Sequence, residues 1–332
     1  MSSVLIDLEI PWVEKYRPNS FDEIVSQNLA VENLKEFVSK GNMPHMIFAG
    51  PAGTGKTSTA LIIAKHAIKK ENYFSNVLEL NASDTVRMAY VRSVIKNFVS
   101  QNLTPEKNAL KLIILDEADN IPNQVQQALR RIIEKTSLNV KFILMCNYIN
   151  RIIDPIISRC AVFRFTNLSK DKVIERLRFI AKKENLNIPQ TEENKFYETL
   201  FFISGGDLRK AINALQMSVA LELLKNLDSN EILKVSGFLD NSTLNELLEN
   251  IRSKNLIRSR KTLETVETLD ARNFLRQMIG SLNELDIQPE YLSKILSYFG
   301  DVDYRISQGA DERIQLMSLI SHLIKSSIKK KE

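Results

Sequence analysis

Hydrophobic residues divide the chain into two parts with different periodicities. In the first part, short runs rich in β-branched or aromatic residues recur at 45–49, 77–80, 112–115, 141–146 and 161–165. Amphipathic stretches with helical spacing lie between them, at 58–69, 89–98 and 124–134. Three of the short runs are almost purely apolar, as expected for strands buried on both faces of a parallel sheet. The alternation therefore predicts a doubly wound α/β domain.

The second part of the chain has the pattern of a helical protein. From about residue 207 onward, Leu and Ile recur at helical spacing among Lys, Glu, Asn and Ser, with few Gly or Pro residues between them. We expect a boundary near residue 166, where the last strand ends and Ser169 is placed to cap the next helix.

Composition excludes several classes of protein. With 44% hydrophobic and 26% charged residues among 332, the chain can form packed cores, and wholesale disorder is not expected. The longest apolar runs are about five residues, against roughly 18 for a membrane helix, so we expect no membrane association. The first residues lack a basic region, so no secretory signal is expected. Two Cys and three His exclude a zinc ribbon, and the net charge of +5 permits an anionic partner without requiring one.

A glycine-rich segment predicts a nucleotide site. Residues 50–57 match G-x-x-x-x-G-K-[ST], between an apolar run and a helical pattern. The predicted phosphate-binding residues are Gly50, Pro51, Ala52, Gly53, Thr54, Gly55, Lys56, Thr57 and the following Ser58. Glycines let backbone N–H groups converge on phosphate oxygens, and the helix N-terminus adds positive charge. Lys56 is expected to reach the β- and γ-phosphates of ATP, and the Thr57 hydroxyl to ligate Mg²⁺.

Polar residues at the ends of two later runs predict hydrolysis. The apolar run 112–115 leads into Asp116 and Glu117, which should lie at the carboxyl edge of the sheet beside the glycine-rich loop. Asp116 is expected to hold Mg²⁺, and Glu117 to act as general base on the attacking water. We interpret Asp119 as an N-cap of the next helix. Asn147 follows the run 141–146 and is expected to bind the γ-phosphate or that water.

With these motifs the chain resembles the AAA+ ATPases and, more closely, the small subunits of replication factor C. The resemblance covers nearly the whole chain, and its motifs stand at 11–18, 42–45, 78–84, 116–119, 126–131, 146–148, 158–160, 206–212 and 309–316. The most specific of them is Ser158-Arg159-Cys160.

The resemblance implies roles at the matching positions. The adenine pocket would be lined by Val13, Arg17 and Val25. Two sensor positions are implied, sensor 1 at Asn147 and sensor 2 at Arg209. Arg159 matches the arginine finger, which acts in trans on the ATP of the neighbouring subunit by neutralising charge on the transferring phosphoryl group. Asn81 matches a residue that restrains the catalytic Glu until DNA binds.

The resemblance also implies architecture and biology. We expect an AAA+ α/β core with a parallel sheet at 1–166, a helical lid at 167–230 and an all-helical oligomerisation collar at 231–332. The implied function is an ATP-driven clamp loader subunit, active within a hetero-pentamer of clamp loader subunits during DNA replication and repair. Its other partners would be a ring-shaped sliding clamp of the PCNA type and primer–template DNA. The location implied is the nucleus, or the cytoplasm if the source is archaeal.

One segment departs from the family pattern, and two alternatives stay open. Where the family reads Asp-Glu-Arg-Gly, this chain reads Asp84-Thr85-Val86-Arg87, so DNA contact is expected from the shifted Arg87 or from Arg92. Another AAA+ machine, such as a branch-migration motor or a remodeller, should carry an aromatic pore loop or a winged helix. A scaffold subunit that binds nucleotide without turnover should have a damaged Lys, Asp-Glu or sensor.

Overall fold

The chain folds into two compact units, each with its own core. The computed structural model describes residues 10–82, 88–100, 110–136, 139–225, 227–266, 268–285, 287 and 289–326. The first unit comprises residues 1–186 with 204–213, and the second comprises 187–203 with 214–332. The division into core, lid and collar at residues 166 and 230 remains a prediction.

The first unit is built on a five-stranded parallel sheet, which confirms the predicted α/β class. The strands are β1 (His45–Ala49), β2 (Val77–Asn81), β3 (Lys111–Asp116), β4 (Val140–Cys146) and β5 (Cys160–Arg164). They are ordered β2-β3-β4-β1-β5, and all neighbours run parallel. The central strands β1, β3 and β4 are buried over nearly their whole length, whereas the edge strand β2 alternates between more and less buried residues. The Gly-rich loop and the acidic motif therefore start from the interior of the sheet.

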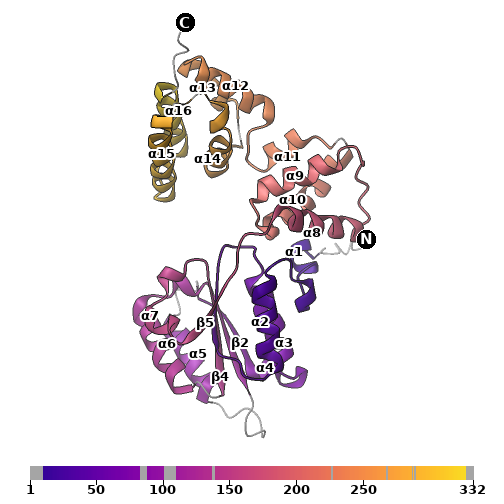
Figure 1. The fold of residues 1–332 in the computed structure, drawn as a ribbon, viewed down its shortest axis with the longest axis vertical. Helices are drawn as coiled ribbons and strands as arrows, with labels where there is room; N and C mark the ends of the chain where they lie inside the picture. The colour runs from indigo at the N-terminus through magenta and orange to yellow at the C-terminus, as the bar shows by residue number, and fades with distance from the viewer. Residues whose placement is uncertain are drawn as a thin grey trace, which may run out of the picture. The chain divides into compact units, whose positions relative to one another are not determined.

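Helices cover both faces of this sheet (Figure 1). One face is packed by α2 (Asn28–Ser39), α3 (Lys56–Ala67) and α4 (Tyr73–Asn76), and the other by α5 (Met88–Ser100), α6 (Asn123–Thr136) and α7 (Asp154–Ile157). The unit also contains α1 (Trp12–Lys15), α8 (Lys170–Lys183) and the first turns of α10 (Leu208–Ala220). Alternate residues of one strand face opposite sides, so that Met46 and Phe48 pack against α2 and α3, while Ile47 packs with α5 and α6 residues. As predicted, α8 begins after Ser169, but the Ser169 side chain makes no capping hydrogen bond.

The described part of the second unit is built from helices. They are α9 (Glu193–Ser204), the later turns of α10, α11 (Ser229–Val235), α12 (Asn241–Arg252), α13 (Leu256–Glu264), α14 (Ala271–Gly280), α15 (Pro289–Ser307) and α16 (Glu312–Ser326). Leu, Ile and Phe side chains from α12, α14, α15 and α16 form its core, as their helical spacing predicts.

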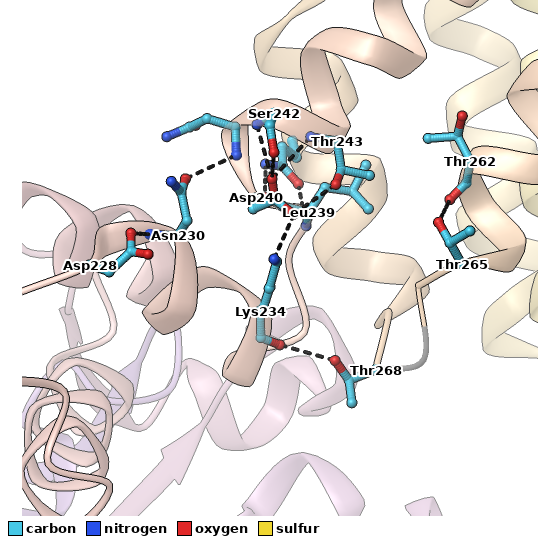
Figure 2. A network of polar contacts seen from close by, with 12 residues as sticks. Asp228, Asn230, Lys234, Leu239, Asp240, Ser242, Thr243, Thr262, Thr265 and Thr268 are labelled. Carbon is cyan, nitrogen blue, oxygen red and sulfur yellow. Dashed lines mark hydrogen bonds and ion pairs between the residues drawn. The ribbon is translucent and has the colours of Figure 1, made fainter.

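A polar network at the start of α12 fixes the chain between α11 and α12 (Figure 2). Asp240 is the N-cap residue of α12, and its carboxylate accepts hydrogen bonds from the backbone N–H groups of Ser242 and Thr243, both at 3.0 Å. Lys234 lies 3.3 Å from the second carboxylate oxygen. Burial opposes ionisation of Asp240, but hydrogen bonds from the Ser242 and Thr243 hydroxyls, from the Thr243 N–H and from Lys234 outweigh it and hold the pKa of the carboxyl well below its usual value.

Candidate functional site

The glycine-rich loop joins β1 to α3 in a conformation that requires glycine. Gly53 has φ +69°, and a Cβ atom there would lie 1.7 Å from Oδ1 of Asp207. At Gly50, a Cβ atom would lie 2.0 Å from the carbonyl oxygen of Phe165. The loop is therefore packed between the last strand of the sheet and the start of α10, with no room for side chains at either glycine.

Lys56, the first residue of α3, is buried and points back into the loop. Its Nζ donates to the carbonyl oxygens of Gly50 at 2.6 Å and Pro51 at 2.8 Å, and to Oδ1 of Asn147 at 3.1 Å. Burial lowers the pKa of the Lys56 ammonium, while the negative charge of Asp116 opposes that shift. The ammonium is thus placed where phosphate oxygens would take over as stronger, charged acceptors.

Thr57 and Asp116 form an oxygen-donor pair suited to Mg²⁺. The Thr57 hydroxyl donates to Oδ2 of Asp116 at 3.0 Å, and Oδ1 of Asp116 accepts from the backbone N–H of Glu117 at 2.8 Å. Among the described residues, no group of three His, Cys, Asp or Glu side chains forms a metal cage. A hydroxyl and one carboxylate fit Mg²⁺, which usually keeps water and substrate phosphates as its other ligands.

Glu117 occupies an uncommon backbone conformation at the end of β3. Its φ of 53° lies in the left-handed region, which costs energy for a residue with a Cβ atom. The turn directs the chain away from the strand, and Oε2 of Glu117 accepts from Nδ2 of Asn120 at 3.1 Å. The side chain lines the same cavity as Lys56 and Thr57, where a general base would meet an attacking water.

A cavity of about 170 Å³ unites most of the predicted site residues. Predicted residues that line it are Val13, Arg17, Val25, Ala52, Gly53, Thr54, Gly55, Lys56, Thr57, Ser58, Asp116, Glu117, Asn147 and Arg209. Gly50 and Pro51 are outside the lining but bind Lys56 through their carbonyl groups. Asn81 stands opposite Asp116 in the strand register, at the same edge of the sheet.

The apolar part of the cavity lining was only partly predicted. Besides Val13 it includes Ile24, Leu168, Leu208 and Ile212, and apolar side chains of this kind suit a purine ring. Spacing along the chain gave no signal for these residues, because they come from elements far apart in sequence.

Helix α8 and its C-cap residue Glu184 hold Lys15 and Tyr16 beside the cavity. The Tyr16 hydroxyl donates to Oε1 of Glu184 at 2.6 Å, and Lys15 forms an ion pair with the same oxygen. Nη2 of Arg176 donates to the carbonyl oxygen of Tyr16 at 2.8 Å. Burial raises the pKa of Tyr16 to about 12, together with its hydrogen bond to Glu184. These contacts span about half the chain, so sequence reasoning missed them.

The prediction for Asp119 is wrong. Helix α6 begins at Asn123, so Asp119 lies too early to cap it and sits in the 3-10 helix η4 (Ala118–Asn120). Its carboxylate accepts from the backbone N–H groups of Asn147 at 3.2 Å and Tyr148 at 3.1 Å. The side chain therefore accepts hydrogen bonds from the turn that follows the neighbouring strand β4, and it does not cap the following helix.

Arg159 lies apart from the cavity of its own chain. The cavity lining does not include it. Its Nη2 lies 2.7 Å from Oε1 of Glu134, its Nη1 donates to the carbonyl oxygen of Pro155 at 2.7 Å, and its side chain is 37% exposed. Of the two DNA-contact predictions, Arg87 lies outside the described residues, and for Arg92 the structure gives only its position in α5.

Known proteins resemble the chain over its full length. A family model described as "ATPase family associated with various cellular activities (AAA)" matches residues 46–168, and a "Replication factor C C-terminal domain" model matches 240–322. The replication factor C small subunit 1 of Pyrobaculum aerophilum is 42% identical over 318 residues, covering 95% of this chain and 94% of that protein. The replication factor C small subunit of Aeropyrum pernix is 42% identical over 334 residues, covering 99% of both.

A solved structure supports the same fold at a greater distance. The RuvB Holliday junction branch migration motor of Thermotoga maritima matches with a TM-score of 0.55 and 19% identity, over 82% of this chain and 93% of that one. At this identity the match shows the fold alone.

The source of these relatives bears on location. The two small-subunit relatives named above come from archaea, so they do not support the expected nuclear location. Within the described residues, no helix is long and apolar enough to cross a membrane.

The family models and the full-length identities agree with the motifs of the site, and the chain belongs to the replication factor C small subunit family of AAA ATPases.

Proposed function

We propose that this chain is an ATP-hydrolysing subunit of a clamp loader, which opens a ring-shaped sliding clamp of the PCNA type and loads it onto primer–template DNA. The observation that carries the proposal is the complete set of ATPase groups at one edge of the sheet. The Thr57 hydroxyl donates to Asp116, and Lys56 donates to the carbonyl oxygen of Gly50 in the loop and to Asn147. Glu117 and Asn147 line the same cavity.

Each group has one task in hydrolysis. The loop N–H groups and Lys56 bind the phosphates of ATP, and Thr57 and Asp116 hold Mg²⁺, which neutralises phosphate charge when bound. Glu117 accepts the proton of the attacking water, and Asn147 orients that water or the γ-phosphate. Arg209 lines the same cavity from the start of α10, where it would contact the nucleotide.

The location of Arg159 supports catalysis between subunits. A guanidinium outside its own cavity, anchored at the surface by Glu134 and the Pro155 carbonyl, is free to present its remaining N–H groups to an adjoining subunit. We propose that it acts there as an arginine finger. Hydrolysis would then require the assembled oligomer.

The second unit has a surface suited to assembly. A groove of about 770 Å³ between α13 and α16 is lined mainly by apolar residues, of which Ile257 is 73% and Ile314 is 65% exposed, together with Arg260, Glu264, Glu312 and Arg313. An exposed apolar groove of this kind is typical of protein interfaces. It supports the proposed oligomerisation collar, with other clamp loader subunits as its partners and a hetero-pentamer as the expected assembly.

Two alternatives are disfavoured. A branch-migration motor would carry a winged helix, whereas the described part of residues 229–326 consists of helices and their connections. A scaffold subunit without turnover would lack one of the catalytic groups, and Lys56, Asp116, Glu117 and Asn147 are all present in the site. The archaeal relatives favour a cytoplasmic clamp loader over a nuclear one.

The test is ATP turnover of the assembled complex with and without clamp and primed DNA. We expect stimulation by clamp and primed DNA together in the parent complex. Glu117→Gln should keep ATP affinity and abolish turnover, and Asp171→Asn, an exposed carboxylate on α8, is the matched control. Turnover that ignores both clamp and DNA would contradict the clamp loader assignment, and unchanged turnover in Glu117→Gln would contradict the role of Glu117 as base.

A further inference from the structure

Asp119 is a buried carboxylate with no role in the ATPase chemistry derived above. Only 8% of the residue is exposed. One carboxylate oxygen, Oδ2, accepts two backbone hydrogen bonds, from Asn147 at 3.2 Å and from Tyr148 at 3.1 Å. The other oxygen, Oδ1, is buried and has no hydrogen-bond partner in the described part of the chain. Burying a charged group costs free energy unless hydrogen bonds or an opposite charge compensate it. Here the two backbone N–H groups provide that compensation.

The two N–H groups that Asp119 accepts belong to the turn that carries sensor 1. Strand β4 ends at Cys146, and Asn147 is the next residue. The Asn147 side chain points to the phosphate loop, since its Oδ1 accepts from Lys56 at 3.1 Å. Charge-assisted hydrogen bonds to two successive backbone N–H groups restrict the φ and ψ angles from which this side chain projects.

The same short segment carries the general base. Glu117 leaves β3 in the left-handed conformation, and Asp119 follows two residues later in η4. The segment therefore places the base at one end and the anchor of the sensor 1 turn at the other. In this way the ends of the paired strands β3 and β4 are tied together across the site.

We propose that Asp119 is a positioning residue for Asn147, which fixes the sensor 1 turn so that the Asn147 amide faces the phosphates and the attacking water. This inference rests on the proposed ATPase function. A purely electrostatic role on Lys56 is the rival explanation, because Asp119 is also one of the negative charges near that ammonium. The two explanations differ in whether the carboxylate's charge or its acceptor geometry matters.

Substitutions at Asp119 separate geometry from charge. Asp119→Ala removes both the charge and the acceptor, whereas Asp119→Asn keeps an oxygen acceptor and removes the charge. In the assembled complex at saturating ATP, we expect Asp119→Ala to lower kcat about tenfold to a hundredfold, with ATP affinity changed less than about threefold. Asp119→Asn should recover a rate closer to that of the parent than to that of the Ala variant. Asp171→Asn again controls for loss of a carboxylate.

A double variant tests whether Asp119 acts through Asn147. If it does, Asn147→Ala and the double variant Asn147→Ala/Asp119→Ala should have the same kcat, because groups that act as a unit are not additive. Losses that multiply in the double variant would overturn the proposal. The proposal would also be overturned if Asp119→Asn were as slow as Asp119→Ala, because the effect would then be due to the negative charge near Lys56.

Amide hydrogen exchange gives a readout that does not depend on turnover. In the full chain, the N–H groups of Asn147 and Tyr148 should exchange at least about tenfold faster in Asp119→Ala, with Asp119→Asn between it and the parent. Unchanged exchange in a folded Ala variant would overturn the proposal even if turnover fell. If the parent complex itself had no ATPase activity, the proposed function would fail, while the exchange measurement would still decide whether Asp119 holds the turn.

Discussion

Replacing Arg159 by Ala tests the assignment of catalysis to the interface between subunits. In the single chain, the guanidinium contacts Glu134 and the Pro155 carbonyl, each at 2.7 Å, and the side chains of the ion pair are 37% and 33% exposed. Exposed pairs contribute about 0–1 kcal/mol to stability. We therefore expect Arg159→Ala to unfold at nearly the parent temperature and to bind ATP with parental affinity in its own cavity.

The expected catalytic loss is far larger than the loss of stability. Arginine fingers contribute about 10³–10⁵ to kcat, which corresponds to about 4–7 kcal/mol of transition-state stabilisation. Arg159→Lys should recover only a small part of this, since an ammonium keeps the charge but cannot present the planar fork of a guanidinium. Turnover, ATP affinity and thermal unfolding measured on the same preparations separate a catalytic role from a structural one.

Complementation distinguishes action in trans from action in cis. Arg159→Ala retains Glu117, and Glu117→Gln retains Arg159, so an interface between the two variants contains one intact site if the finger acts in trans. Mixed oligomers, verified by native mass spectrometry, should hydrolyse ATP although each variant alone does not. Mixed oligomers that form and stay inactive would refute the assignment, and so would loss of ATP binding by the isolated Arg159→Ala chain.

Three other substitutions test separate parts of the structure. Thr57→Val removes the hydroxyl that donates to Asp116 and should raise the Mg²⁺ concentration needed for ATP turnover about tenfold, measured by titration. Gly53→Ala places a Cβ atom 1.7 Å from Oδ1 of Asp207, at a residue with φ +69°. It should lower the free energy of unfolding by about 1–2 kcal/mol, measured by thermal unfolding, and should weaken ATP binding. Asp240→Asn should lower the free energy of unfolding, measured in urea at pH 7, by about 2 kcal/mol. Because the folded-state pKa of Asp240 is lowered, its contribution is present above the ordinary carboxyl pKa of about 4 and lost as the pH falls below it, and the Asn variant should lack this pH dependence.

The sequence predicted those features that local periodicity and strand ends determine. Runs buried on both faces identify β1, β3 and β4, and the placement of Asp116 beside the glycine-rich loop follows because parallel strands bring their carboxyl ends to one edge. At the edge strand β2 the pattern is weaker, since only β3 pairs with it among the described strands and alternate residues remain partly exposed.

Contacts between distant segments could not be predicted in this way. Asp119 illustrates the reason: an acidic residue after a strand has the same local pattern whether it caps the next helix or accepts from the neighbouring strand. Its partners at Asn147 and Tyr148 are nearly 30 residues away. The Tyr16 contact with Glu184 spans 168 residues. Such pairs depend on how the elements pack, which periodicity does not encode.

The charges lining the cavity explain why hydrolysis would wait for a neighbour. Among the described residues, three cations line the cavity, and one of them, Arg17, is paired with Glu14 at 2.6 Å. The other two, Lys56 and Arg209, are balanced by the carboxylates of Asp116 and Glu117. MgATP brings a net negative charge into this balanced site, and burial already disfavours the charged form of Lys56. Residues of one chain can therefore bind the nucleotide but leave the charge of the transferring phosphoryl group without full compensation. Under the proposed function, a guanidinium from an adjoining subunit would supply the missing cation, and turnover would then depend on Arg159 and on assembly.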